Sequence, residues 1–147
     1  MNSIMFGTGC RRFTGGLIAG LFEISMVDGA LAATCDNKTA KSSISWTFEI
    51  EPTFHTCHFC HEGAAPEQLI MTPGVAYKFL VNIPSTESQM MRVDPGNPEN
   101  SYILYKLRGT HMENGGQGVQ MPIGFDPLPE KQIQMIEDWI KDCSPDN

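Results

Sequence analysis

The chain has 147 residues, of which 41% are hydrophobic and 18% are charged, a balance typical of one soluble globular domain rather than of a disordered chain. Its 17 acidic residues outnumber its 10 basic residues and give a net charge of −7, which argues against nucleic acid or an anionic membrane surface as a partner. Fourteen glycines and ten prolines predict long turns around few regular elements.

Residues 1–32 are predicted to be a secretory signal peptide. Two arginines precede the apolar segment FTGGLIAGLF, and residues 30–32 have the small-x-small form of a signal peptidase site. Ten apolar residues are too few to cross a membrane as a helix, which needs about 20. We therefore expect cleavage after Ala32, an exported or periplasmic domain of residues 33–147, and no membrane span in the mature chain. The alternative is an apolar N-terminal helix that the mature domain keeps.

After this segment the sequence predicts four helices joined by turns. The first begins with Pro52 in its first turn and runs into Cys57, and the segment SWTFEIE before it forms either an extra turn or an extended lead. The second begins with Thr72 as its N-cap and Pro73 in its first turn. Its apolar positions share one face, which we expect to be buried: Ala76, Phe79, Leu80 and Ile83.

The third and fourth helices have clearer boundaries. Asn97 and Pro98 begin the third helix, and Gly109 ends it, because glycine is favoured just beyond a helix C-terminus. The fourth follows Pro129 and places charged residues opposite an apolar stripe. The fold class is therefore mostly α. The two helices contribute these apolar positions to the core: Tyr102, Ile103, Tyr105 and Leu107 from the third, and Ile133, Ile136, Trp139 and Ile140 from the fourth.

The segment HTCHFCHEG, residues 55–63, holds two cysteines and three histidines and allows three interpretations. A structural zinc site needs four ligands, and no second Cys or His pair of the usual spacing follows. A thioredoxin-type dithiol follows a β-strand, and no apolar, β-branched strand precedes Cys57. The third interpretation is the C-x-x-C-H pattern of covalent haem attachment, which an exported chain favours.

In a C-x-x-C-H motif both thiols bond to the vinyl groups of one haem, and the adjacent imidazole becomes an axial ligand of the iron. The spacing lets one helical turn present both sulfur atoms to the same edge of the porphyrin. The sequence therefore predicts one covalent haem c attached at Cys57 and Cys60, with His61 as an iron ligand. His55 and His58 are expected to face solvent or a haem propionate rather than the iron.

The ligand on the opposite side of the iron separates an electron carrier from a catalyst. Met121 is the favoured candidate because it lies in the segment GGQGVQMPIG, whose glycines can bring backbone close to the haem face. A methionine thioether also raises the reduction potential. The competing candidates lie in other predicted loops: His111, which would give a bis-histidine iron, and Met112, Met90 and Met91. Met71 and Met135 are assigned to the core.

Four segments resemble the single-haem c-type cytochrome domains of exported bacterial proteins, including those called planctomycete-type. They are EIEPTFHTCHFCHEGAAPEQLIMTPGVAYKFLVNIPS, VDPGNPENSYILYKLRGT, GVQMPIG and LPEKQIQMIEDWIKDC, and they cover most of residues 33–147. The resemblance implies a small helical domain wrapped around one haem, with Cys57 and Cys60 as thioether sites and His61 and Met121 as iron ligands. It also implies that Trp139 packs the last helix against the first.

The chain carries Cys143 near its end, where such domains often have Gly-Ala. The terminal helices of such a domain are expected to pack together, which would bring Cys143 close to Cys35 in front of the first helix. The implied pairing is a Cys35–Cys143 disulfide, which an exported location permits. Two unpaired thiols or an intermolecular bridge are the alternatives.

The function expected from these features is that of an exported c-type cytochrome, which carries one electron and is not an enzyme. Its partner would be another redox protein, and the acidic charge favours a basic one. Two alternatives keep the haem and change its use. One is a haem protein with an open coordination site, of peroxidase or gas-binding type, and the other is a haem subunit that docks onto a larger oxidoreductase.

Overall fold

The fold is taken from a computed structural model, which describes residues 35–63 and 68–147. The predicted signal peptide, residues 1–32, lies outside the described residues. Within the described part every regular element is a helix, and β pairing is limited to three isolated bridges. The mostly α fold class is therefore confirmed at that level.

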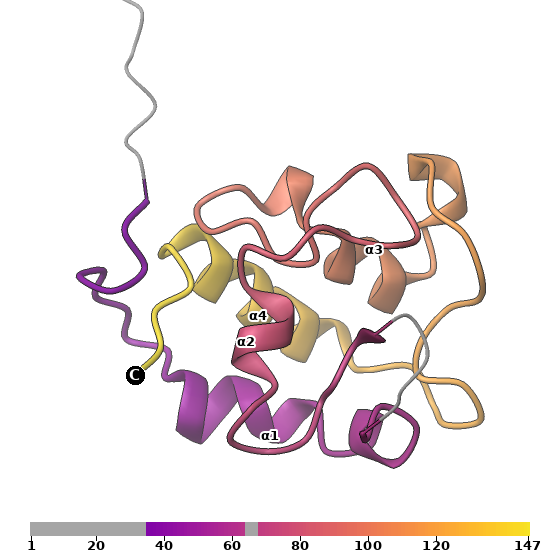
Figure 1. Cartoon of the computed structure of the whole chain (residues 1–147), viewed down its shortest axis with the longest axis horizontal. Coiled ribbons are helices and arrows are strands. Elements are labelled where there is room, and N and C mark those ends of the chain that lie inside the picture. The colour runs from indigo at the N-terminus through magenta and orange to yellow at the C-terminus, as the bar shows by residue number, and fades with distance from the viewer. Residues whose placement is uncertain (1–34, 64–67) are drawn as a thin grey trace, which may run out of the picture. The chain divides into compact units, whose positions relative to one another are not determined.

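Long irregular segments join the helices, and α2, α3 and α4 lie at the centre of Figure 1 with α1 along its lower edge. In chain order the elements are η1 (Trp46–Ile50), α1 (Glu51–Thr53), η2 (Cys57–Phe59), α2 (Tyr77–Leu80), η4 (Pro98–Asn100), α3 (Tyr102–Arg108), η5 (Met112–Asn114) and α4 (Glu130–Lys141). Here η1 is a π-helical turn, and the other η elements are 3₁₀ turns.

The first helical segment starts earlier than the position of Pro52 predicts. It begins at Trp46 as η1 and continues directly into α1. Ser45 caps it, because its Oγ accepts the Phe48 N–H at 3.3 Å and its own N–H donates to the Glu49 carboxylate at 2.6 Å. The segment SWTFEIE thus forms the extra turn, and Pro52 lies inside the helical segment. The π-helical turn leads into Pro52, which has no N–H of its own to donate.

The second helix is shorter than its pattern predicts. A hydrogen-bonded turn begins at Thr72, and α2 covers only Tyr77–Leu80. The helix ends there because Val81 takes an extended conformation and joins an isolated bridge. Ile83 therefore lies beyond the helix, whereas Ala76 is buried as predicted.

The third and fourth helices end close to the predicted positions. The turn η4 leads into α3, and Gly109 ends α3 in the left-handed region with φ of 77°. Helix α4 begins directly after Pro129. The apolar stripe of α4 is buried in full: Ile133, Ile136, Trp139 and Ile140.

Aromatic side chains join the beginning and the end of the domain. The ring of Trp46 lies 5.3 Å from the rings of both Tyr77 and Trp139, measured between centroids. Trp139 is fully buried, and its indole N–H donates to the Pro145 carbonyl at 3.0 Å. Trp139 therefore packs the last helix against the first helical segment, as the resemblance implied. The core around these rings holds Ile50, Phe54, Leu80, Leu104, Leu107, Ile133, Ile136 and Ile140.

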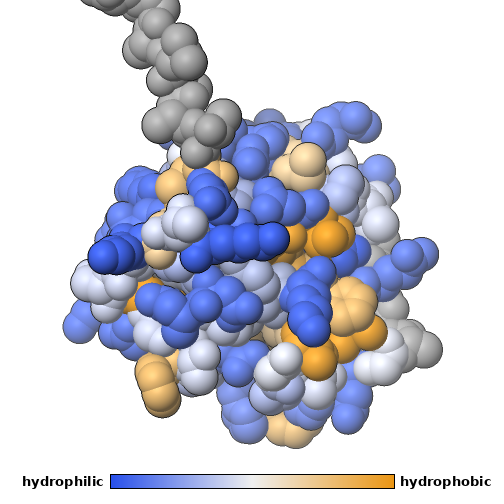
Figure 2. All heavy atoms as spheres, turned by 60° about the vertical axis from the view of Figure 1, so that its left-hand side comes forward, coloured by the Kyte–Doolittle hydropathy of each residue, from blue (hydrophilic) through white to orange (hydrophobic). Residues whose placement is uncertain are grey.

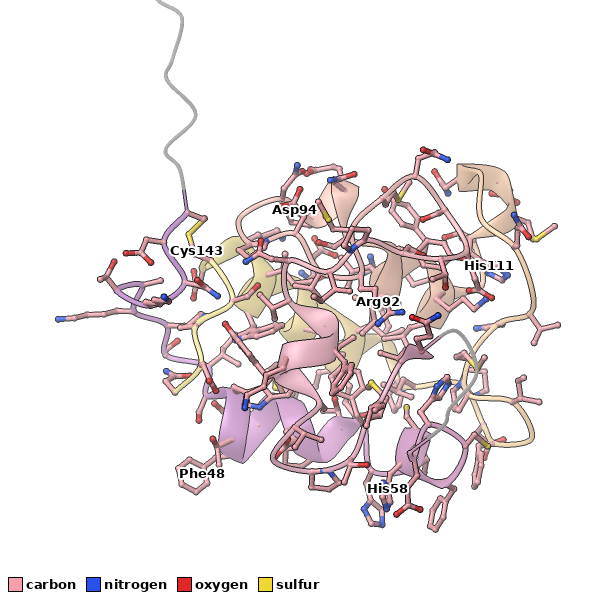
Figure 3. The ribbon with its side chains drawn as sticks, in the orientation of Figure 1. Phe48, His58, Arg92, Asp94, His111 and Cys143 are labelled. Atoms are coloured by element: carbon pink, nitrogen blue, oxygen red, sulfur yellow. A yellow bond between two sulfur atoms is a disulfide. The ribbon has the colours of Figure 1, made fainter. Side chains whose placement is uncertain are left out.

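Cys35 and Cys143 form a disulfide, with 2.01 Å between their sulfur atoms, so the implied pairing is confirmed (Figure 3). The bond links positions 108 residues apart. Gly96 lies against it, because its N–H donates to the Ile140 carbonyl at 2.7 Å and a Cβ there would lie only 2.3 Å from Cys35 Sγ. Position 96 therefore accepts glycine alone without a shift of the disulfide.

Candidate functional site

The C-x-x-C-H segment forms a single tight turn. Cys57 begins η2, and its carbonyl accepts the N–H groups of Cys60 at 3.2 Å and of His61 at 2.9 Å. The turn therefore places all three residues within a short length of backbone, as the motif predicts. Both thiols are free; that of Cys60 is exposed, and that of Cys57 is half-buried. Burial raises the pKa of the Cys57 thiol, and a hydrogen bond with Thr56 partly opposes this effect.

His61 is held in one orientation. Its side chain is buried, with 8% of its surface exposed, and its Nδ1 lies 3.1 Å from the carbonyl oxygen of Leu69. A carbonyl oxygen can only accept, so Nδ1 carries the proton and Nε2 keeps a free lone pair. The His61 carbonyl also accepts the Met71 N–H at 2.7 Å. This is the arrangement by which proteins prepare a histidine to bind a metal through Nε2.

A cleft lies beside this turn. Its empty space of about 1010 Å³ includes open solvent at its mouth. Cys57 and His61 line it together with apolar side chains from α2, α3 and the intervening segments: Phe54, Leu69, Met71, Leu80, Tyr102, Ile103, Leu107, Val119, Met121 and Ile123. Met71 thus lines the apolar wall of the cleft. With 4% of its surface exposed, it also belongs to the core, as the sequence predicted.

A smaller hollow of about 570 Å³, including open solvent, adjoins the cleft. Both spaces share Cys57, His61, Met121 and Ile123, and the smaller one is also lined by Cys60. The four residues predicted from the motif and the methionine loop are therefore brought together around two cavities that share lining residues. No single residue of this set lies elsewhere in the fold.

The competing ligand candidates lie elsewhere among the described residues. His111, labelled in Figure 3, is 3% exposed, but its Nε2 donates to the Gly118 carbonyl at 3.2 Å, and it is not among the residues that line the cleft. Met112 is 63% exposed, and neither it nor Met90 or Met91 lines either cavity. Of the candidates raised by the sequence, Met121 is the one that the fold brings to His61.

The two other histidines of the motif do not line the cavities. His55 is exposed, whereas His58 is half-buried and its Nε2 lies 3.9 Å from the exposed Glu62 carboxylate. The expectation that these side chains face solvent is met by His55 and only partly by His58, whose Nδ1 is buried. Within residues 35–63 and 68–147, no three His, Cys, Asp or Glu side chains gather as a chelating group, whereas a structural zinc site requires four such ligands.

One part of the cleft wall is polar, and sequence reasoning missed it. It consists of Ser85, Thr86, Glu87, Arg92 and Lys106. Arg92 is buried, and its Nη1 donates to the Phe79 carbonyl at 2.8 Å (Figure 3). Lys106 forms an ion pair of 2.5 Å with Glu87. One signal was available for Lys106, because it lies one turn after Tyr102 on the predicted inner face of a helix.

The residues present fit a haem. Haem has a large apolar ring and two carboxylates, and the cleft has apolar walls with one polar part. Cys57 lines both cavities, Cys60 lines the smaller one, and His61, whose Nδ1 proton is held by the Leu69 carbonyl, keeps the lone pair on Nε2.

No protein-family model matches the chain, and neither does any curated protein or solved structure with which it was compared. No helix in the described part of the chain has the length and apolar character that a membrane span requires. The arrangement of Cys57, Cys60, His61 and Met121 around the cleft is therefore the observation on which a function is proposed.

Proposed function

We propose that this protein is an exported c-type cytochrome that carries one electron. One haem would be attached at Cys57 and Cys60, with His61 and Met121 as the two iron ligands. The observation that supports the proposal most is that these four residues, which are up to 64 positions apart in the chain, line two adjoining cavities.

Each residue has a distinct task in this proposal. Cys57 and Cys60 hold the cofactor covalently, so that it is retained outside the cell, where a dissociated haem would be lost. His61 binds through Nε2, because the Leu69 carbonyl holds the proton on Nδ1. The bound haem supplies an iron that changes its oxidation state by one unit. The apolar walls exclude water, which lowers the energy needed to rearrange the surroundings when charge changes.

Met121 would decide that the site carries electrons rather than converting a substrate. A thioether in the distal position leaves no coordination site for oxygen or peroxide, and it raises the reduction potential. The main chain of Met121 is tied to α3, because its N–H donates to the Lys106 carbonyl at 3.2 Å. The partner would be a redox protein of positive charge, since the chain has a net charge of −7.

The surface agrees with a role in transient contact. On the face shown in Figure 2, hydrophilic residues predominate and hydrophobic ones gather in small patches. The exposed apolar residues include Phe59, Val119, Ile123 and Phe125, which are next to or part of the cavity walls. An apolar rim of this kind around a cofactor permits close approach of a partner without a permanent interface.

Covalent attachment gives the direct test of this function. Thioether bonds survive denaturation, so haem should migrate with the polypeptide on a denaturing gel after extraction with acidified acetone. The C57A/C60A variant should lose this haem. The C35A/C143A variant is the matched control, because it also lacks two cysteines but keeps the motif, and it should retain the haem. Complete extraction of haem from the unaltered protein, or one equivalent of zinc in its place, would refute the proposal.

A further inference from the structure

The segment that carries Met121, residues 116–121, is held against α3 by hydrogen bonds to its main chain. The Tyr102 hydroxyl lies 3.2 Å from both the N–H and the carbonyl oxygen of Gln117. The Lys106 ammonium donates to the same carbonyl at 2.7 Å. Four residues later, the Met121 N–H donates to the Lys106 main-chain carbonyl. Lys106 therefore holds this segment at two points, once through its side chain and once through its backbone.

The charge of Lys106 is balanced by Glu87 from another loop. Their ion pair measures 2.5 Å, and the side chains are only 10% and 20% exposed. Removing charges from water is costly, and a buried pair persists only where further hydrogen bonds satisfy it. The Gln117 carbonyl supplies such a bond, and the Lys106 ammonium also lies 5.7 Å from the centre of the Tyr102 ring. The pair thus joins three segments: the loop of Glu87, helix α3 and the segment of Gln117.

Two glycines of the segment lie directly against this contact. A Cβ at Gly118 would lie 2.7 Å from a Glu87 carboxylate oxygen and 2.9 Å from the Lys106 ammonium. A Cβ at Gly116 would lie 2.5 Å from the Tyr102 ring. The sequence pattern GGQGVQM was expected to bring backbone close to a haem face. Gly118 does line the cleft, and the structure shows a second close approach, in which the glycines let the backbone lie directly on Tyr102 and the ion pair.

We propose that the Lys106–Glu87 pair is a latch that positions Met121 in the cleft. With the latch closed, the segment of residues 116–121 lies against α3, and Met121 faces the cavities that His61 also lines. Lys106 and Glu87 are thus positioning residues, which act through the main chain of Gln117 and Met121. The role in iron ligation rests on the proposed function, whereas the role in holding the segment stands on the contacts alone.

The test replaces Lys106 by methionine, which keeps the length of the side chain and removes its charge. Amide hydrogen exchange in residues 116–121 should become about tenfold faster, because a hydrogen bond to a charged group is lost. In the haem-loaded protein, the weak sulfur-to-iron absorption band of the ferric state should decrease, and the ferrous iron should begin to bind carbon monoxide. Covalent haem should persist, because the motif is untouched.

Three further variants make the result specific. K106R keeps the charge and should restore the band, whereas E87Q should weaken it. The matched control is K131M, at an exposed lysine of α4 that makes no ion pair, and it should leave exchange and spectrum unchanged. If K106M folds poorly, E87Q gives the same measurements and leaves Lys106 in place.

The outcomes separate the latch from the proposed function. Unchanged exchange in both K106M and E87Q would overturn the latch, with or without haem. Faster exchange with an unchanged band and no carbon monoxide binding would overturn its role in placing Met121. An unaltered protein without covalent haem would refute the proposed function, and faster exchange in that protein would still support the latch on the segment.

Discussion

Two histidines of the same motif, three positions apart, have different surroundings. His61 is buried, and its Nδ1 faces the Leu69 carbonyl, whereas His58 is half-buried and its Nε2 lies near the exposed Glu62 carboxylate. Motif spacing predicted that His61 rather than His58 would be the cofactor ligand, because the C-x-x-C-H pattern itself names the position, and of the two only His61 lines the cavities. It could not predict the Leu69 carbonyl, because that contact depends on how residues 68–71 return to the turn.

Met121 gives a prediction at the scale of one residue. In the M121A variant the sulfur-to-iron band of the ferric protein should vanish, the reduction potential should fall, and the ferrous protein should bind carbon monoxide, because the distal thioether is gone. Absorption spectroscopy with a redox titration measures all three. M112A is the control, since Met112 is exposed and away from the cleft, and it should behave like the unaltered protein. If the band persists in M121A, the assignment of Met121 is wrong and another residue supplies the sulfur ligand.

Gly96 gives a second prediction at this scale. Alanine at position 96 should destabilise the protein by about 1–3 kcal/mol more than alanine at position 74. Both glycines have φ near 80°, so both substitutions carry the same backbone strain, but only Gly96 lies against Cys35 Sγ. Denaturant unfolding of G96A and G74A measures the difference. In a C35A/C143A background the difference should disappear, and its persistence there would contradict a clash with the disulfide.

At the scale of elements, sequence patterns predicted helix boundaries better where a glycine or a proline sets the boundary than where a contact with a distant segment sets it. Gly109 and Pro129 set boundaries of α3 and α4 by their own backbone preferences, and both agree with the structure. Helix α2 ends early because Val81 pairs with Val93, a contact that local pattern does not contain. The contacts of the segment GGQGVQM with Lys106 and Glu87 were missed for the same reason, because the three come from separate parts of the sequence.

The ion pairs between α3 and α4 give a prediction about pH. Bonds from Lys141 and then Arg108 lower the pKa of Glu137 below its ordinary 4.5. A lowered pKa in the folded state means that the stabilisation is present above pH 4.5 and is lost as pH falls through the folded value. E137Q should therefore reduce the free energy of unfolding by about 1 kcal/mol at pH 7.

Denaturant unfolding across the pH range checks this expectation. The difference in unfolding free energy between E137Q and the unaltered protein should shrink as pH falls below 4.5. The carboxylate of Glu137 then becomes protonated and, like glutamine, carries no charge. E113Q is the matched control, at an exposed glutamate without an ion pair, and it should change stability little at any pH. A difference for E137Q that stays constant down to pH 3 would contradict the assignment.

At the scale of the whole molecule, the Trp46–Trp139 contact and the Cys35–Cys143 disulfide both join the ends of the domain. A bond that links residues 108 positions apart restricts the unfolded chain strongly. The C35A/C143A variant should therefore lose about 2–4 kcal/mol of unfolding free energy. Equal denaturation midpoints for the two proteins, or two alkylated thiols at these positions without a reductant, would contradict this role.

The central claim is that Cys57 and Cys60 hold one haem covalently, and the intact mass of the denatured protein tests it most directly. The protein should be produced in cells that contain a cytochrome c maturation system, denatured, treated with an alkylating agent and weighed by mass spectrometry. The account predicts the mass of the polypeptide plus one haem, with no alkylation at Cys57 or Cys60. A polypeptide without haem, alkylated at both cysteines, would contradict it.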